Sequence, residues 1–125
     1  MLLPNCPLRT AEDICKSYEL ITQNKATCIM SVVKYHWLYP FWALQEKNGR
    51  LHKVFGNKFF KDSWRLPQEV YCPSGAVRWV KVKNFLKEKS FYGRGLIKFE
   101  VPFERSADID TYEDLELAKK LYKLI

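Results

Sequence analysis

The sequence predicts a protein of the α/β class with an antiparallel hairpin inserted in its sheet. Predicted elements follow one another as helix, strand, hairpin, strand, helix, strand and helix, and apolar residues recur at helical spacing near both ends of the chain. Near the centre, Asn48-Gly49 is a strong signal for a two-residue hairpin turn. A length of 125 residues is typical of one domain, so we expect residues 1–125 to form a single domain.

The first elements are a helix and a buried strand. Thr10, with Asp13 three residues later, is typical of a capped helix start, and apolar residues follow at helical spacing. These features predict a helix over 11–23. The segment 27–34 is short, apolar and rich in β-branched residues, which predicts a largely buried strand.

The hairpin is predicted in the middle of the chain. Its two strands, 41–46 and 50–55, flank Lys47-Asn48-Gly49. The following residues, 57–75, are predicted to be irregular because they contain residues that break regular structure. These are Pro67, Pro73 and Gly75.

The second half of the chain predicts a strand over 76–82, a short helix over 83–88 and a strand over 96–101. Thr111, with Asp114 three residues later, repeats the capped helix start. An apolar stripe at helical spacing then continues to the last residue. The chain is therefore expected to end on an amphipathic helix that docks on another surface.

The opening of the chain is unusual for the α/β class. Such a domain usually begins with a buried strand that seeds the sheet, whereas Met1 stands only a few residues before the first predicted helix. We therefore expect a sheet that lacks its first strands. An exposed apolar face and an unpaired strand edge would favour self-association.

The chain is basic, with a formal net charge of +7 and an isoelectric point near 9.3. Basic residues are densest over 78–98, where they alternate with aromatic residues. This pattern fits a nucleic-acid surface, a site for phosphorylated ligands or simple solubility. The first residues contain two prolines and no long apolar stretch, so they predict neither a signal peptide nor a membrane span, and a cytoplasmic location is expected.

Cysteine and histidine spacing gives little sign of a metal site. The four cysteines lie far apart, so we expect small buried or half-buried thiols rather than a zinc site or a disulfide framework. His36 and His52 have no second ligand at suitable spacing. We expect surface or packing roles for both.

The pair Asp108 and Asp110 is the strongest candidate for chemistry. In extended chain their side chains project to the same side, while Ile109 turns toward the core. Two carboxylates at the end of a strand suit magnesium, which prefers oxygen ligands and is often shared with substrate phosphates. The alternative from spacing alone is a pair of solvated acids before a helix cap.

Three stretches of the sequence stand in an order that matches one known family. They are Val101-Pro-Phe-Glu-Arg-Ser-Ala-Asp-Ile-Asp-Thr-Tyr-Glu-Asp-Leu-Glu-Leu-Ala118, Leu3-Pro-Asn-Cys-Pro-Leu-Arg-Thr-Ala-Glu-Asp13, and Leu66-Pro67 followed by Cys72-Pro-Ser-Gly-Ala-Val77. All three resemble stretches of the acylneuraminate cytidylyltransferases. The first resembles the family's C-terminal signature, and the second resembles its mid-chain stretch Leu-Gln-Pro-Thr-Ser-Pro-Leu-Arg. The third is similar to the family's Leu-Pro followed by Asn-Gly-Ala-Ile. This family includes the enzymes that make CMP-sialic, CMP-legionaminic and CMP-pseudaminic acids.

The resemblance covers nearly all of the chain and implies a truncated doubly wound, Rossmann-like nucleotidyltransferase sheet. It implies the C-terminal half of the family's fold, including its dimerisation region. In the family's reaction a sugar hydroxyl attacks the α-phosphate of CTP and releases pyrophosphate, and magnesium offsets the phosphate charge. On this resemblance Asp108 and Asp110 are the magnesium ligands. The implied substrate-binding residues are Arg9, Ser74, Gly75, Phe91 and Tyr92.

Arg9 corresponds to the arginine of the family's Pro-Leu-Arg, and its role can be structural as readily as functional. Phe91 and Tyr92 align with an aromatic pair in the family's dimerisation region that reaches toward the partner's sugar site.

The sequence also departs from the family's pattern. The family's triphosphate-holding loop, Pro-Ala-Arg-x-Gly-Ser-Lys, does not occur in these 125 residues. Ser63 replaces an arginine that contacts the sugar acid, which removes a bidentate carboxylate clamp. Three further positions differ: Leu3 replaces Gln, Ser74 replaces Asn, and Arg78 replaces a frequent Tyr.

The sequence therefore favours a truncated cytidylyltransferase-like protein that forms a homodimer or a higher oligomer and does not turn over alone. The hairpin at 41–55 and the strand at 76–82 are the expected contact elements. Aromatic residues there fit either a subunit interface or the chain's own core: Trp37, Phe41, Trp42 and Trp79. Two alternatives stay open: an enzyme completed by a separate N-terminal half or a longer chain, and a basic module that binds nucleic acid or another anionic partner through 78–98.

Overall fold

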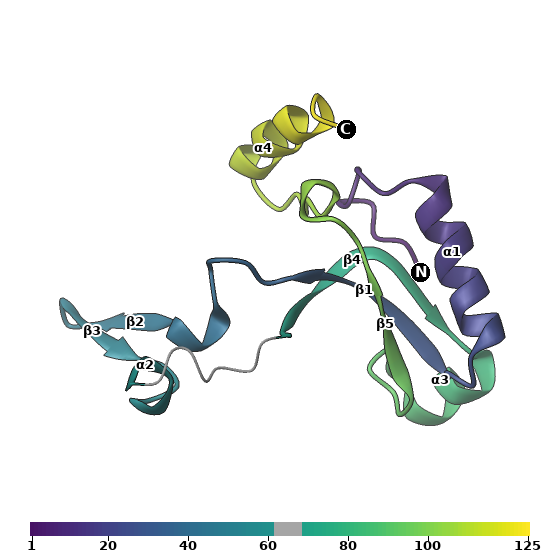
Figure 1. The fold of residues 1–125 in the computed structure, drawn as a ribbon, viewed down its shortest axis with the longest axis horizontal. Helices are drawn as coiled ribbons and strands as arrows, with labels where there is room; N and C mark the ends of the chain where they lie inside the picture. The colour runs from purple at the N-terminus through teal and green to yellow at the C-terminus, as the bar shows by residue number, and fades with distance from the viewer. Residues whose placement is uncertain (62–68) are drawn as a thin grey trace. The chain divides into compact units, whose positions relative to one another are not determined.

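The computed structural model describes residues 1–61 and 69–125 (Figure 1). The chain divides into two compact units, and each is described by itself. The sheet unit consists of Met1–Val33 and Cys72–Ile125, and the hairpin unit consists of Lys34–Tyr71. Ser63 and Leu66-Pro67, which enter the family resemblance, lie outside the described residues.

The main sheet of the described residues has three strands in the order β4-β1-β5. Their bounds are β1 (Cys28–Lys34), β4 (Tyr71–Val80) and β5 (Leu96–Glu100). β1 and β5 are parallel, with Cys28 opposite Leu96 and Val32 opposite Glu100. All but the last two residues of β1 are buried, as expected for a central strand of an α/β sheet.

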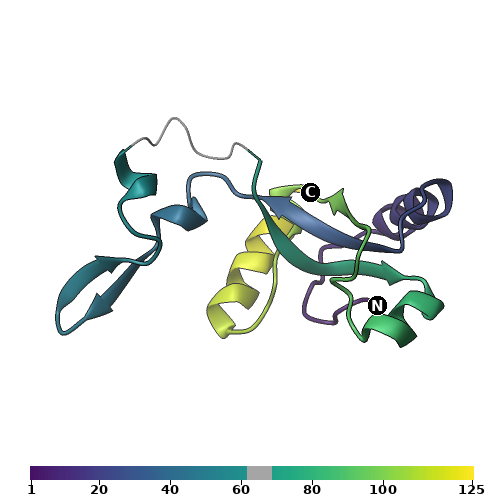
Figure 2. The same cartoon turned by 90° about the horizontal axis from the view of Figure 1, so that it is seen from below.

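β4 runs antiparallel to β1. The backbone N–H of Lys81 donates to the carbonyl of Thr27 over 2.9 Å, and that of Val77 donates to Ser31 Oγ, also over 2.9 Å. Figure 2 shows β4 alongside β1, with the helix that follows β4 at the end of the sheet. The predicted fold class is confirmed: the chain is an α/β protein, compatible with a Rossmann-like nucleotidyltransferase sheet with a hairpin insertion.

The N-terminal residues pair with the outer edge of β4. The Met1 amine donates to the Arg78 carbonyl over 2.7 Å, and the Arg78 N–H donates to the Met1 carbonyl over 2.9 Å. The Leu3 N–H donates to the Gly75 carbonyl over 3.0 Å. These bonds satisfy backbone groups along the edge of β4 from Gly75 to Arg78, where the strand would otherwise be open to another chain.

The helix α1 (Ala11–Gln23) forms over the predicted residues. The Thr10 side chain accepts from the Asp13 N–H, and the Asp13 carboxylate accepts from the Thr10 N–H, which completes the predicted capping box. Trp79 of β4 donates from its indole N–H to Ser17 Oγ over 2.9 Å, and its ring lies 5.2 Å from that of Tyr18. Trp79 therefore belongs, at least in part, to the core of its own chain.

The remaining helices of the sheet unit agree with the sequence prediction. They are α3 (Val82–Glu88) and α4 (Tyr112–Tyr122), with a 3-10 turn, η3 (Phe103–Arg105), between β5 and α4. α4 carries the second predicted capping box, formed by Thr111 and Asp114.

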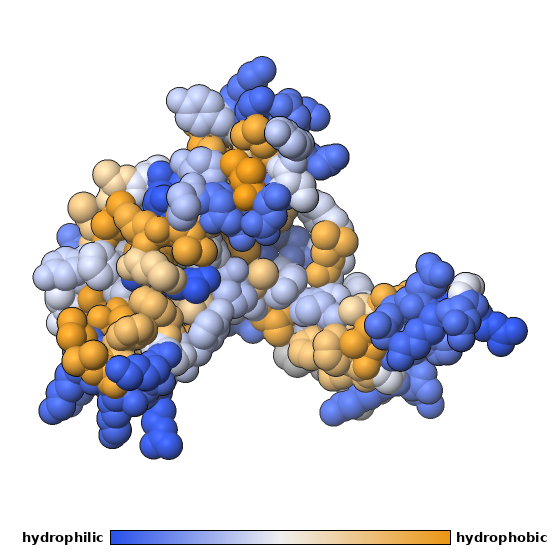
Figure 3. All heavy atoms as spheres, turned by 180° about the vertical axis from the view of Figure 1, so that it is seen from behind, coloured by the Kyte–Doolittle hydropathy of each residue, from blue (hydrophilic) through white to orange (hydrophobic). Residues whose placement is uncertain are grey.

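The hairpin unit confirms the predicted Asn-Gly turn. β2 (Leu44–Lys47) pairs with β3 (Arg50–Lys53), and positive φ angles at Asn48 (53°) and Gly49 (72°) are those of a type I′ turn. Both strands differ from the prediction: β2 begins at Leu44 because the preceding residues form a 3-10 turn, η1 (Pro40–Trp42), and β3 ends at Lys53. Figure 3 shows hydrophilic side chains gathered over this hairpin.

Aromatic side chains from η1 and from the segment after the hairpin pack together within the hairpin unit. The rings of Phe41 and Phe59 stack with centroids 4.5 Å apart, and the Trp42 indole donates to the Phe59 carbonyl over 3.0 Å. Phe41 and Trp42 therefore make contacts within their own chain. Trp37 is 74% exposed, and whether a second subunit covers it stays a prediction.

The prediction that 57–75 is irregular is wrong for two described parts of that range. A short helix, α2 (Lys58–Lys61), forms in the hairpin unit, and β4 begins at Tyr71 and not at 76. Pro73 is tolerated in β4 because it precedes the stretch where the N-terminal residues pair with the outer edge. Gly75 is needed there for close packing rather than for a turn.

No helix in the described part of the chain is both long enough and apolar enough to cross a membrane. The cysteines largely follow expectation, since Cys6 and Cys28 are buried and Cys72 is half-buried, whereas Cys15 is exposed. His36 and His52 both lie on exposed positions.

Candidate cation and substrate site

The acid pair lies on the loop that follows β5. Asp108 and Asp110 stand between η3 and α4, beyond the carboxyl end of β5, and both are exposed. Neither carboxylate forms an ion pair with a described residue. The pair is therefore accessible from solvent and keeps its charge available for a ligand, at the edge where α/β sheets place their ligands.

The loop is held by two residues from the other end of the chain, Asn5 and Cys6. The Asn5 side-chain amide donates to Asp110 Oδ1 over 3.2 Å, and the Cys6 thiol donates to Asp108 Oδ1 over 3.4 Å. Between the two acids, the Ile109 N–H donates to the Asn5 carbonyl over 2.9 Å. Residues more than 100 positions apart in sequence therefore form one local structure.

Cys6 remains a thiol at neutral pH. Its residue is 2% exposed, and burial, together with the negative charge of Asp108, raises the pKa of the Cys6 thiol to about 11. A protonated thiol is a hydrogen-bond donor, although a weak one, so Cys6 can donate to Asp108.

The start of α4 adds a second support for the loop. The N–H groups of Asp110 and Thr111 both donate to Asp114 Oδ2, over 3.1 Å and 2.8 Å. The hydrogen bond from the Thr111 hydroxyl, together with these two backbone bonds, holds the pKa of Asp114 below its usual value. An open pocket of about 230 Å³ lies here, lined by Ile109, Asp110, Thr111, Tyr112 and Leu115.

Gly75 and Ser74 lie next to this site but inside the sheet. Ser74 is buried, and its hydroxyl accepts from the Ala76 N–H over 3.2 Å. A Cβ added at Gly75 would lie 2.6 Å from Leu3 Cδ1 and 2.7 Å from Cys6 Sγ. Gly75 therefore allows the N-terminal segment, and with it Cys6, to approach β4.

Arg9 makes structural contacts in this chain. Its Nη1 donates to the Leu3 carbonyl over 2.7 Å and to the Ala76 carbonyl over 3.0 Å. One guanidinium thus ties the N-terminal segment to β4. A substrate contact for Arg9 stays a prediction.

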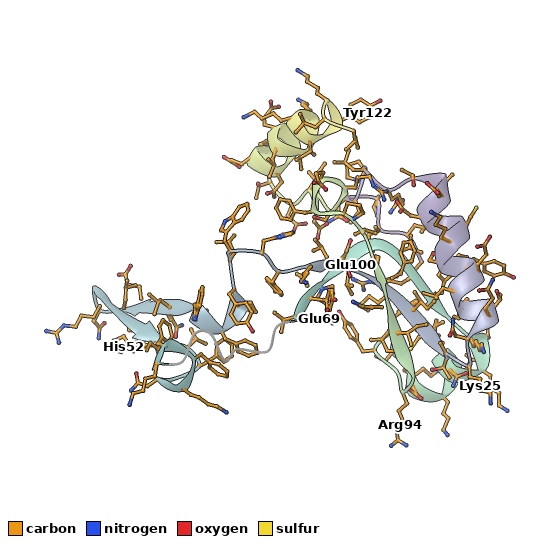
Figure 4. The ribbon with its side chains drawn as sticks, in the orientation of Figure 1. Lys25, His52, Glu69, Arg94, Glu100 and Tyr122 are labelled. Atoms are coloured by element: carbon orange, nitrogen blue, oxygen red, sulfur yellow. The ribbon has the colours of Figure 1, made fainter. Side chains whose placement is uncertain are left out.

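Phe91 and Tyr92 lie at the other end of β5 from the acid pair. They belong to the loop between α3 and β5, where Figure 4 labels Arg94, whereas Glu100 is labelled at the far end of the strand. Five residues of strand span about 17 Å. The chain therefore does not bring Phe91 and Tyr92 together with its own Asp108 and Asp110, and their assignment to a partner's site stays a prediction.

The acid pair fits magnesium by the chemistry of its donors. Among residues 1–61 and 69–125, no group of three or more His, Cys, Asp or Glu side chains is arranged to hold a metal ion. Magnesium, however, is commonly bound through one or two carboxylates and completes its shell with water and substrate phosphates. Asp108 and Asp110 offer such a pair.

Sequence reasoning missed the contribution of Asn5 and Cys6. Both residues lie within a stretch that carries the family resemblance, but nothing local connects them to the acids. The only signal was that the two stretches, at opposite ends of the chain, both carry the same family resemblance.

An α/β sheet with a carboxylate pair beyond the end of a parallel strand is typical of enzymes that handle phosphorylated ligands. Comparison with known proteins agrees: the chain is similar to sugar-acid cytidylyltransferases. Two pseudaminic acid cytidylyltransferases, from Campylobacter jejuni subsp. jejuni serotypes O:2 and O:23/36, are each 25% identical to it over 123 residues. This similarity covers 98% of the chain and 53% of each relative, so the chain spans about half the length of the curated relatives it matches. No profile of a known protein family matches the chain.

Proposed function

We propose that this chain is a cytidylyltransferase-like protein and supplies the cation side of a site that transfers CMP from CTP to a sugar acid of the sialic or pseudaminic type. The observation that carries the proposal is the exposed acid pair Asp108 and Asp110, held at the end of β5 in a chain similar to such enzymes over 98% of its length.

In this proposal Asp108 and Asp110 hold magnesium, which would offset the charge of the CTP phosphates. The chain's own residues position the two carboxylates and keep them free of competing cations. The triphosphate-holding Gly-Ser-Lys loop does not occur in these 125 residues, so we propose that they do not turn over CTP alone. The alternative is turnover when another polypeptide segment supplies that loop.

The cation site is tested by titrating the protein with Mn²⁺, a magnesium substitute that is observed by electron paramagnetic resonance. We expect saturable binding that Asp108→Asn and Asp110→Asn each weaken by at least tenfold, because each variant removes a charged ligand. Glu104→Gln is the matched control, since Glu104 is an exposed acid in η3 outside the pair. Absence of binding, or equal affinity in all variants, would refute the assignment.

Turnover is measured in parallel as pyrophosphate release from CTP, magnesium and a sialic-type sugar acid. We expect none above background from these residues alone. Release that depends on Asp108 and Asp110 would instead favour an enzyme that is complete in this chain.

We also propose a homodimer that uses the hairpin unit. Large apolar side chains are exposed there, with Leu51 67% and Leu38 76% exposed. Burial of such residues between subunits would remove apolar surface from water. Phe91 and Tyr92 of one copy would then reach toward the acid pair of the other.

The dimer is checked by light scattering coupled to size-exclusion chromatography. We expect twice the chain mass of 14.9 kDa for the unmodified protein and a shift toward the monomer for Leu51→Lys. Leu124→Lys, a change at a leucine near the end of the chain that is 76% exposed, should leave the dimer intact. A monomeric unmodified protein would contradict the proposal.

A further inference from the structure

We infer that Asn5 and Cys6 are positioning residues of the cation site: together they hold the carboxylates of Asp108 and Asp110 in the arrangement that receives a divalent cation. This inference rests on the proposed function of the acid pair. It concerns residues that make no contact with the cation themselves and act through the two carboxylates.

The four side chains form one connected chain of polar contacts. Asp108 Oδ1 accepts from the Cys6 thiol at 3.4 Å, Cys6 Sγ lies 3.9 Å from Asn5 Oδ1, and the Asn5 amide donates to Asp110 Oδ1 at 3.2 Å. A thiol has a single hydrogen, and the shorter contact favours its donation to Asp108. Asn5 and Cys6, which are adjacent in sequence, thus each donate a hydrogen bond to one of the two carboxylates.

The backbone fixes the register between the two segments. The Ile109 N–H donates to the Asn5 carbonyl over 2.9 Å, so the residue between the two acids is bound to the same segment that orients them. Because Ile109 lies between the two acids, this one backbone hydrogen bond fixes the position of both Asp108 and Asp110. Sliding the loop by one residue would break all three hydrogen bonds together.

The segment that carries Asn5 and Cys6 is itself anchored to the sheet. The Leu3 N–H donates to Gly75, the Arg9 guanidinium donates to Leu3, and the Cys6 N–H donates to the Leu3 carbonyl over 3.4 Å. Cys6 Sγ also packs against Gly75, where any Cβ would lie within 2.7 Å of the sulfur. The position of the acid loop is therefore set by β4, the most distant strand from β5 in the sheet.

The chemistry of the two donors is suited to a cation site. Asn5 and Cys6 are uncharged, so they orient the carboxylates without neutralising them, whereas a lysine or arginine would compete with a divalent cation. Each donor uses only Oδ1 of its acid, and no described residue bonds to the Oδ2 atoms of Asp108 and Asp110. One oxygen of each carboxylate therefore remains for the metal.

The first test compares Mn²⁺ affinities. We expect Asn5→Ala and Cys6→Ala each to weaken binding by about 10-fold, the usual effect of losing a residue that orients a metal ligand. Cys6→Ser keeps a donor and should restore most of the affinity. Cys15→Ala, at an exposed cysteine far from the acids in the sequence, is the matched control and should bind as the unmodified protein does.

The possible failures of this test are distinct. Binding by the unmodified protein that Asn5→Ala and Cys6→Ala leave unchanged would overturn the positioning role and leave the acid pair in place as a cation site. Absence of binding in the unmodified protein would overturn the proposed cation site and with it the role assigned to Asn5 and Cys6.

A second measurement needs no metal. In ¹⁵N relaxation experiments on the metal-free protein, Asn5→Ala and Cys6→Ala should raise the fast backbone motion of Asp108 and Asp110, while the amides of β1 and α1 keep their values. Unchanged motion in the acid loop would overturn the inference whatever the Mn²⁺ titration gives. Loss of the β1 and α1 signals would mark Cys6→Ala as unfolded, in which case Asn5→Ala decides the test, because the Asn5 side chain is not buried.

Discussion

Replacing Asp13 with alanine is expected to lower the free energy of unfolding by about 2 to 4 kcal/mol. The Asp13 side chain is 6% exposed and forms an ion pair with Arg105, whose side chain is 20% exposed. It also completes the capping box of α1 with Thr10. The substitution removes both interactions and leaves a largely buried guanidinium without its carboxylate partner, which is the costly part.

Chemical denaturation measures this effect. Glu12→Ala is the matched control, because Glu12 is the neighbouring acid of the same helix turn but is exposed, and it should cost little. Asp13→Ala combined with Arg105→Met should be less destabilising than Asp13→Ala alone, since the unpaired charge is then absent. A cost for Asp13→Ala no larger than that for Glu12→Ala would contradict the role assigned to this ion pair.

The same carboxylate makes stability depend on pH. Burial alone would raise the pKa of Asp13, but hydrogen bonds from Arg105 and Thr10 and the Arg105 charge outweigh it and hold the pKa below the ordinary value of 3.8. A lowered folded-state pKa means that the stabilisation is fully present above the unfolded value and is lost as pH falls through the folded one. Asp13→Asn should therefore flatten the acid side of the stability profile.

Replacing Gly75 with alanine is expected to cost about 1 to 3 kcal/mol by overpacking. The new Cβ would lie 2.6 Å from Leu3 Cδ1 and 2.7 Å from Cys6 Sγ, well inside normal contact distance. Because Cys6 orients Asp108, the displacement should also weaken Mn²⁺ binding. Denaturation and the Mn²⁺ titration, made on the same samples, check both effects.

Two variants make the Gly75 result specific. Leu3→Ala removes the nearest clashing atom, so Gly75→Ala should cost less in that background than in the unmodified protein. Gly93→Ala is the control, because its new Cβ would clash only with the end of the flexible Glu88 side chain, which can move aside, and would make an ordinary contact of 3.8 Å with Cys28 Sγ. Equal costs for Gly75→Ala and Gly93→Ala would show that the N-terminal segment is not tightly packed on β4.

Local signals predicted most of the secondary structure. Thr10 with Asp13 and Thr111 with Asp114 mark helix starts through bonds made within four residues, and Asn48-Gly49 determines its turn by its own φ preferences. Such interactions need no information from the rest of the chain.

The features that sequence reasoning missed depend on distant contacts. β4 extends through Pro73 and Gly75, against their local preferences, because β1 pairs along one edge and the N-terminal residues approach Gly75 from the other. The acid pair was visible in the sequence. Its supports, Asn5 and Cys6, were not, since a hydrogen bond across 105 residues leaves no spacing pattern to recognise.

The parallel pairing of β1 with β5 has a consequence for how the protein is made. Cys28 meets Leu96 only after the hairpin unit, β4 and α3 have all been synthesised, so β1 emerges from the ribosome long before its partner. Until then an apolar strand edge is open to neighbouring nascent chains. We therefore expect closure of this long loop, rather than formation of the helices, to limit the folding rate.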